Sequence, residues 1–176
     1  MKRIIIVVAA LALAAPLAAL AADPGTPPGQ ACRTERQAMG ADAFKALYGT
    51  NADKSNAFGK CVAKKAAQRG HAAATAAAQC RAEQADSTFA DNHGGKTFDQ
   101  FYGTGQNGKD AFGKCVSAKA KAADDAADAT VLNAVKQCRT ERGNDPAAFR
   151  AKYGKNRNRA NAFGKCVALT AKAHTP

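Results

Sequence analysis

Large aliphatic residues are scarce in this 176-residue chain once its first 22 residues are set aside. No isoleucine lies beyond residue 22, and three leucines, five valines and eight phenylalanines are spread over the remaining 154 residues. About a tenth of that part is therefore large and apolar, below the roughly 20% at which disorder becomes the expectation. This scarcity excludes one large conventional core, and alanine supplies most of the remaining apolar content.

Residue types that carry catalysis are also few. Only three serines occur, none of them in a nucleophile motif, and the three histidines show no zinc-ligand spacing with cysteine. The six cysteines are even in number, and paired cysteines are poor metal ligands. The sequence therefore predicts a protein that is not an enzyme and has no catalytic residue, no metal and no cofactor.

Residues 1–22 have the order of a secretory signal peptide. Lys2 and Arg3 are followed by an apolar stretch and by small residues that end at Ala22. We expect cleavage near Ala21 or Ala22 and a Pro/Gly-rich linker over residues 23–29. An even number of cysteines suits an oxidising compartment. We therefore expect a secreted or cell-envelope protein with no membrane span after processing.

One segment occurs three times, at residues 30–62 (repeat one), 79–116 (repeat two) and 137–167 (repeat three). Each begins with Cys-Arg-x-Glu, continues with a Phe four residues before Tyr-Gly, and ends with Ala-Phe-Gly-Lys-Cys-Val. All six cysteines, all three tyrosines and all three glutamates of the chain lie at these positions. Chance does not produce that coincidence, so the internal repetition is a strong inference.

The repeated residues predict short helices. A Phe and a Tyr four residues apart share one helix face, and the glycine after each Tyr suits the left-handed residue that ends a helix. A polar residue before the final Ala-Phe-Gly suits an N-cap, and the glycine of that run indicates close backbone packing. The predicted N-caps are Asn56, Asp110 and Asn161, and the predicted close-packing glycines are Gly59, Gly113 and Gly164.

Alanine-rich stretches over residues 63–78 and 117–136 connect the repeats and predict helices, because alanine is the best helix former. Disulfides across such a linker would require it to turn back at its middle, since a continuous helix of 19 residues spans about 28 Å. Gly70 offers a turn in the first linker, but the second has neither glycine nor proline at its middle.

Two cysteine pairings are open on this reasoning. The across-linker alternative joins Cys61 to Cys80 and Cys115 to Cys138. We favour pairing within each repeat, which joins Cys32 to Cys61, Cys80 to Cys115 and Cys138 to Cys166.

The predicted fold class is all-α, with three disulfide-stapled helical repeat modules joined by two long Ala-rich helices. The predicted modules span residues 30–68, 78–121 and 136–173, and the second contains an insert at residues 86–95. The recurring glutamate is expected to form a salt bridge with the lysine before the second cysteine of its repeat. The alternative is a ligand-contacting charge triad with the neighbouring arginine. The glutamates are Glu35, Glu83 and Glu141, the lysines Lys60, Lys114 and Lys165, and the arginines Arg33, Arg81 and Arg139.

Charge is the main indication of function. Beyond residue 22 the chain carries 24 lysines and arginines against 14 acidic residues. Outside the membrane such an excess favours anionic partners, above all wall or envelope polymers, with lipid headgroups or nucleic acid as alternatives; a merely solvating surface is the other interpretation. The candidate anion contacts, from two basic stretches, are Lys60, Lys64, Lys65, Arg69, Arg150, Lys152, Lys155, Arg157 and Arg159.

The string Gln-Cys-Arg-Thr-Glu-Arg, followed by Tyr-Gly and Asn-Ala-Phe-Gly-Lys-Cys-Val, resembles repeats in uncharacterised secreted proteins of high-GC bacteria. This resemblance covers all three repeats and implies export and repetition, with no established activity. Repeat two departs from it through the insert and through Gln84. The sequence thus favours a structural or binding protein of the cell envelope. The alternative is a secreted enzyme or toxin-like effector with a site around Asp91, His93 and Asp99.

Overall fold

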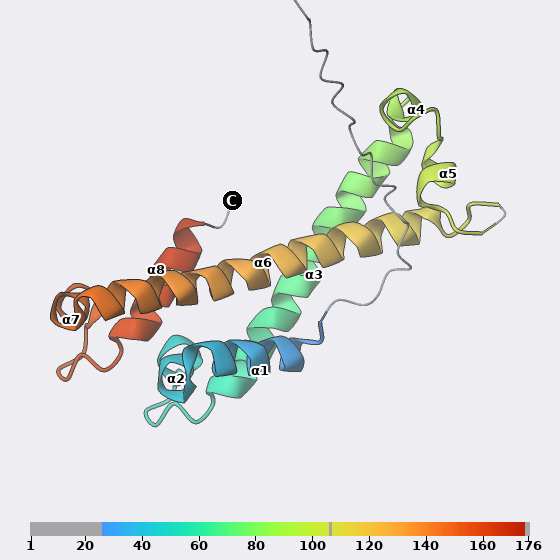
Figure 1. Ribbon diagram of the computed structural model, residues 1–176. Helices are drawn as coiled ribbons and strands as arrows, with labels where there is room; N and C mark the ends of the chain where they lie inside the picture. Colours follow the sequence, from blue (N-terminus) through green and yellow to red (C-terminus); the bar gives the residue numbers. More distant parts are fainter. Residues whose placement is uncertain (1–25, 106, 175–176) are drawn as a thin grey trace, which may run out of the picture.

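The computed structural model describes residues 26–105 and 107–174, and all regular structure within these ranges is helical (Figure 1). The predicted all-α class is therefore confirmed, whereas the expected signal peptide lies outside the described residues. The helices are α1 (Pro28–Met39), α2 (Ala41–Tyr48), α3 (Ala57–Ala85), α4 (Phe89–Asn92), α5 (Phe98–Tyr102), α6 (Ala111–Asn144), α7 (Pro146–Tyr153) and α8 (Ala162–Ala173). Helix α1 begins inside the linker predicted over residues 23–29, because Pro28 suits the first turn of a helix.

Both alanine-rich linkers form continuous helices, α3 and α6, and Gly70 lies inside α3 without turning it. Because a continuous helix keeps its ends apart, each disulfide joins two helices within one repeat. Each pair of cysteines has its Cα atoms 6.0 Å apart. The within-repeat pairing is confirmed and the across-linker alternative is wrong. The bonds are Cys32–Cys61, Cys80–Cys115 and Cys138–Cys166.

The two long helices lie against each other and run in opposite directions. The Cys80–Cys115 disulfide joins the end of α3 to the start of α6. About four turns away along each helix, Lys65 of α3 forms an ion pair with Asp128 of α6. Figure 1 shows the resulting crossing, with α4 and α5 beyond the joined end and α1, α2, α7 and α8 at the other. This crossing brings the start of α3 and the end of α6, and with them repeats one and three, together.

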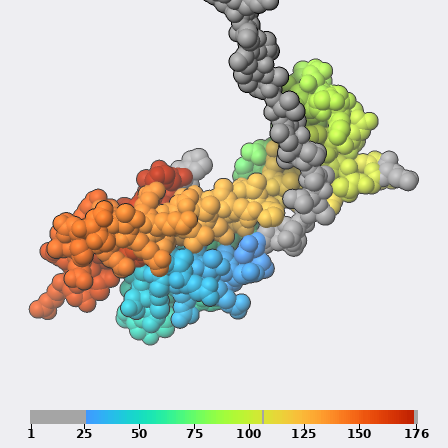
Figure 2. All heavy atoms as spheres, viewed as in Figure 1, coloured from blue at the N-terminus to red at the C-terminus, as the bar shows by residue number. Residues whose placement is uncertain are grey.

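The antiparallel pair divides the apolar residues between two cores. The larger core combines Phe44 and Tyr48 of repeat one with Phe149, Phe163 and Val167 of repeat three. The smaller core contains repeat two alone. We call residues 26–78 and 122–174 the larger body and residues 79–105 and 107–121 the smaller body (Figure 2).

The three predicted modules are therefore not independent of one another. Repeats one and three share one core, because a single repeat has too few large apolar residues to bury much surface by itself. The Phe–Tyr pair predicted to share a face does so in every repeat, with ring centroids 4.9 to 5.0 Å apart.

The junction between repeats one and three depends on a glycine of α8. A Cβ at Gly164 would lie 2.9 Å from the Cβ of Ala46 and 3.1 Å from the backbone of α2. At Gly59 and Gly113, the same position of the other repeats, an added Cβ would meet no atom within 4 Å. The predicted close packing is thus correct only for Gly164, and the partner is another repeat.

The glycine after each tyrosine is not left-handed, which corrects the prediction. Its φ is −71° at Gly49, −70° at Gly103 and −73° at Gly154, all extended backbone. The residue five positions later carries the positive φ instead, and the loop folds back so closely that a Cβ at Gly49 would lie 2.5 Å from the Cβ of Lys54. The left-handed residues are Lys54, Gly108 and Arg159.

The predicted N-cap side chains close these same loops and do not cap the following helix. Asn56 accepts a hydrogen bond from the backbone N–H of Thr50 at 3.0 Å. The equivalent bonds in the other repeats run from Thr104 to Asp110 and from Lys155 to Asn161, both at 3.1 Å. A side chain that is already bonded to the loop behind it does not reach the free N–H groups ahead, which explains the error.

The three equivalent glycines offer a matched test of the junction. We expect Gly59→Ala and Gly113→Ala to raise the free energy of unfolding by about 0.5–1 kcal/mol, because alanine is the better helix former and the space is open. Gly164→Ala should lower it by about 1–3 kcal/mol, since α2 and α8 would have to separate. Urea unfolding followed by circular dichroism measures all three, and equal effects would contradict the role assigned to Gly164.

Candidate functional site

Every glutamate of the chain accepts a hydrogen bond from the tyrosine of its own repeat. Tyr48 donates to Glu35, Tyr102 donates to Glu83 at 2.9 Å, and Tyr153 donates to Glu141 at 2.8 Å. The sequence interpretation missed this pairing. Its signal was present, because both residue types occur three times and only at repeat positions.

A lysine completes each Tyr–Glu pair, but it is not the predicted one. The predicted partners, Lys60, Lys114 and Lys165, precede the second cysteine and do not form these ion pairs. The actual partners in repeats one and two, Lys65 and Lys119, follow that cysteine by four residues. A residue four positions after the cysteine lies on the same helix face as the cysteine. The disulfide holds the helix that carries the glutamate beside that face.

In repeat three the residue four positions after the second cysteine is Thr170, so the cation that pairs with Glu141 comes from another helix. Lys152 of α7 pairs with Glu141 at 2.7 Å. Hydrogen bonds from Lys152 and Tyr153 lower the pKa of the Glu141 carboxyl, and the bond to Glu141 raises the pKa of Lys152. The carboxylate, phenol and ammonium group thus recur in all three repeats, although the chain supplies the ammonium from two different places.

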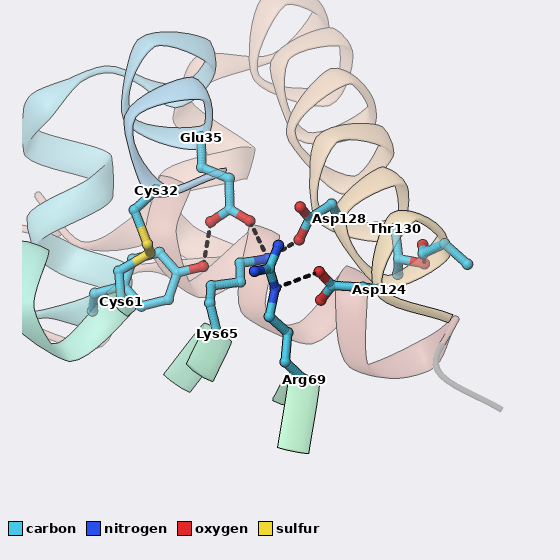
Figure 3. A network of polar contacts seen from close by, with 10 residues as sticks. Cys32, Glu35, Cys61, Lys65, Arg69, Asp124, Asp128 and Thr130 are labelled. Atoms are coloured by element: carbon cyan, nitrogen blue, oxygen red, sulfur yellow. Dashed lines mark hydrogen bonds and ion pairs between the residues drawn. A yellow bond between two sulfur atoms is a disulfide. The ribbon is translucent and has the colours of Figure 1, made fainter. Parts of the chain in front are cut away.

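Only in repeat one is the ion pair between the glutamate and its lysine buried. Helix α6 covers it, and Lys65 lies between Glu35 at 2.6 Å and Asp128 (Figure 3). The side chains of Glu35 and Lys65 are 2% and 3% exposed, whereas that of Glu83 is 30% exposed and that of Glu141 is 40% exposed.

A second ion pair between the same helices extends the buried cluster. The Nε of Arg69 donates to Asp124 at 2.8 Å, one turn from the Lys65–Asp128 pair. Figure 3 shows the two cations of α3 facing the two aspartates of α6. The cluster therefore holds the long helices together at their crossing.

The surroundings of the cluster shift two pKa values upward. Burial alone would lower the pKa of Lys65, but hydrogen bonds and charges from Asp128 and Glu35 outweigh it, and the net shift is upward. Burial, and then the Glu35 carboxylate, raise the pKa of the Tyr48 phenol well above its ordinary value of 10.0. Lys65 stays charged and Tyr48 neutral at any physiological pH, so neither is tuned for proton transfer.

The positions of Lys65 and Arg69 correct the sequence prediction that they contact an anionic ligand. Lys65 is buried, and its charge is already balanced by two carboxylates of the protein. Arg69 directs its Nε to Asp124. Both residues are structural contacts between α3 and α6, because the sequence alone does not reveal that a second helix covers this face of α3.

The other predicted anion contacts lie at the surface of the larger body. Lys60 and Lys64 are exposed on α3, Arg150 and Lys152 are exposed on α7, and the rest follow α7 in the loop. Lys152 pairs with Glu141. Among the described residues, no carboxylate lies within ion-pair distance of the remaining members. These are Lys60, Lys64, Arg150, Lys155, Arg157 and Arg159.

Two loops emerge side by side from the larger body, one with no net charge and one with a net charge of +3. Leu47, two residues before the first loop, lies against Gly164, three residues after the second loop. Residues 49–56 and 154–161 form these loops, which we call the basic loop pair (Figure 1). Their charged residues are Lys54, Lys155, Arg157 and Arg159 against one acid, Asp53.

The charge of the described chain is concentrated on one body. The larger body carries 18 lysines and arginines against 8 acidic residues, a net charge of +10. The smaller body carries 6 against 5, a net charge of +1. Since the larger body consists of two segments far apart in the sequence, this asymmetry becomes visible only once the fold is known.

The insert of repeat two forms part of the smaller core. Phe89 is buried, and the His93 ring stacks on it at 3.8 Å between centroids. The Nδ1 of His93 lies 2.7 Å from the carbonyl of Phe89 and donates to it. Asp91 and Asp99, the other residues of the suggested enzyme site, are exposed, and no hydrogen bond or ion pair joins their side chains to His93 among the described residues.

A cleft of about 850 Å³ lies between α2, α3, α6 and α8. Its walls are mostly apolar, formed by Leu47, Val131, Val167 and several alanines, and its cationic lining residues are Lys64 and Lys172. The sequence interpretation did not find it, because repeats one and three and α6 contribute to it together.

Among the described residues, no group of three or more histidine, cysteine, aspartate or glutamate side chains is arranged to hold a metal ion. Within the same part of the chain, no helix has the length and apolar character needed to cross a membrane. No known protein family, curated protein or solved structure matches the sequence or the fold.

Removing the buried Lys65 should lower the free energy of unfolding far more than removing Lys119, its more exposed counterpart in repeat two. We expect Lys65→Met to lower the free energy of unfolding by about 3–5 kcal/mol, because Glu35 would remain buried without its cation. Lys119→Met removes the equivalent lysine of repeat two and should cost less than about 1 kcal/mol. Urea titration of both variants measures the difference, and similar losses would contradict the burial assigned to repeat one.

The raised pKa of Tyr48 predicts a loss of stability at alkaline pH. The phenol ionises near pH 10.0 in the unfolded chain but resists ionisation when folded, so its contribution is complete below pH 10.0 and declines as the pH rises beyond it. Lys65 acts in the same direction above pH 10.5. Urea unfolding between about pH 8 and 11 should show a flatter decline for Tyr48→Phe than for the unmodified chain. Parallel curves would contradict the prediction.

Proposed function

We propose that this protein is a non-enzymatic binding or structural protein of the cell envelope or extracellular space, and that it contacts anionic polymers through the larger body. The observation that carries this proposal is the charge asymmetry between the two bodies, +10 over 106 residues against +1 over 42 residues, or about four times the net charge per residue. A charge excess needed only for solubility has no reason to be denser on one body. An excess gathered on one body attracts a polyanion and orients it.

The basic loop pair is suited to such a partner. Arg157 and Arg159 offer planar guanidinium groups, which match the oxygens of carboxylates and phosphates. The side-chain oxygens of Asn161 and Asn156 accept hydrogen bonds from the backbone N–H groups of Lys155 and Asn161, and these bonds hold the loop in one shape. A loop ordered before binding loses less conformational entropy when it meets its partner, and this favours affinity.

The compartment agrees with this proposal. Three disulfide bonds favour an oxidising environment outside the cytoplasm, where wall and envelope polymers with phosphate or carboxylate groups are abundant partners. The side chains that the enzyme alternative requires, Asp91, His93 and Asp99, are not joined to one another, and His93 packs against Phe89. We therefore favour binding over catalysis.

The two bodies permit a test with equal changes of charge. Lys155→Gln, Arg157→Gln and Arg159→Gln together remove three charges from the basic loop pair. A matched control removes three charges from the smaller body, through Lys96→Gln, Lys109→Gln and Lys114→Gln. Both triple variants have the same net charge, so any difference in binding reports the position of the charges.

Retention on phosphocellulose and on purified envelope polysaccharide is the measurement. We expect the unmodified chain to bind at about 50 mM salt and to elute at higher salt, because screening weakens the attraction of exposed charges. The loop variant should elute at clearly lower salt than the control variant. Equal elution of both variants, or no retention of the unmodified chain at low salt, would overturn the proposal.

A further inference from the structure

The cleft between α2, α3, α6 and α8 combines an apolar interior with cations and lacks a balancing acid. Its volume of about 850 Å³ lies in the range of ligand sites in proteins, which measure roughly 300–1,000 Å³. No aspartate or glutamate is among its lining residues in the described chain, whereas Lys64 and Lys172 both line it. An apolar cleft lined by two lysines and no acidic residue attracts a molecule with an apolar body and a negative head.

The two lysines come from different walls of the cleft. Lys64, on α3, has its Nζ 5.8 Å from the centroid of the Tyr48 ring, another lining residue. Lys172 lies on α8 and is exposed. Among the described residues, no carboxylate lies within ion-pair distance of either ammonium group. Both ammonium groups therefore remain available to an anionic head.

We propose that this cleft binds a single-chain alkyl carboxylate, with its head near Lys64 and Lys172 and its hydrocarbon chain against the alanines of α6 and α8. The small side chains there leave room for an unbranched chain, and their methyl groups provide an apolar contact surface. This site is separate from the basic loop pair and does not depend on the proposed polymer contact.

Chain length tests the apolar part of the proposal. Calorimetric titration with octanoate, decanoate and dodecanoate, each below its micelle concentration, should give a Kd that falls by up to about fourfold for each added methylene group, the limit for full burial. Hexanoate, which has the same head, should bind weakly or not at all. A Kd that is independent of chain length would overturn the proposal, because it would indicate attraction by charge alone.

Two matched pairs of variants locate the site. Lys64→Gln with Lys172→Gln should weaken dodecanoate binding by about tenfold or more, whereas Lys60→Gln with Lys165→Gln, which removes equal charge outside the cleft, should change it less than about twofold. Ala126→Phe places a phenyl ring on a lining position of α6, in the space proposed for the hydrocarbon chain, and should abolish binding. Ala129→Phe places the same ring on a non-lining position of the same helix, which is also exposed, and should leave binding intact.

Two outcomes would contradict this assignment. Equal losses in the two lysine pairs would mean that dodecanoate is attracted by the net charge of the protein and has no defined site. Self-association that rises with protein concentration, is abolished by Ala126→Phe and is retained in Ala129→Phe would assign the cleft to a second copy of the chain. Sedimentation velocity of the same variants without dodecanoate detects the second outcome. Neither result bears on retention by polymers, which depends on the basic loop pair.

Discussion

The ammonium group of Lys65 is buried, and a buried charge has to be paired. Its two carboxylate partners belong to different helices, Glu35 to α1 and Asp128 to α6, so both helices have to lie within reach of α3 at one point. That requirement determines where the long helices cross. The crossing in turn places α2 against α8 at Gly164, joins the cores of repeats one and three, and encloses the cleft between them.

The same repeated residues have different energetic roles in the three repeats. The ion pair between the glutamate and its lysine is buried in repeat one, partly exposed in repeat two and most exposed in repeat three. Repeat two has no neighbouring repeat to cover it, and its insert supplies the missing contacts through Phe89, whose ring packs between those of Phe98 and His93. The insert, which looked like the most promising place for a catalytic site, thus completes a small core.

Much of the fold was predictable, because it depends on short-range geometry. Alanine-rich segments form helices wherever they lie, and a continuous helix cannot bring Cys61 to Cys80, so the sequence alone favoured the correct disulfides. The candidate site was less predictable. Lys65 and Arg69 belong to the same basic stretch as Lys60 and Lys64, and nothing in that stretch reveals which side chains another helix will cover. Local rules also failed at Asn56 and Gly49, where a loop folding back on itself determines the contacts.

The sequence by itself determined the all-α class and the two long helices and favoured the correct cysteine partners, since each depends on helix propensity or on the reach of a helix over fewer than about 40 residues. Tertiary structure decided which lysines are solvated, where the charge gathers and whether a cleft exists. The reason is physical: the environment of a charged side chain depends on every element packed against it, and Lys65 meets Asp128 across 63 residues of sequence. Repeats that share the same cysteine, glutamate and tyrosine positions therefore have a buried ion pair in one place and an exposed ion pair in another.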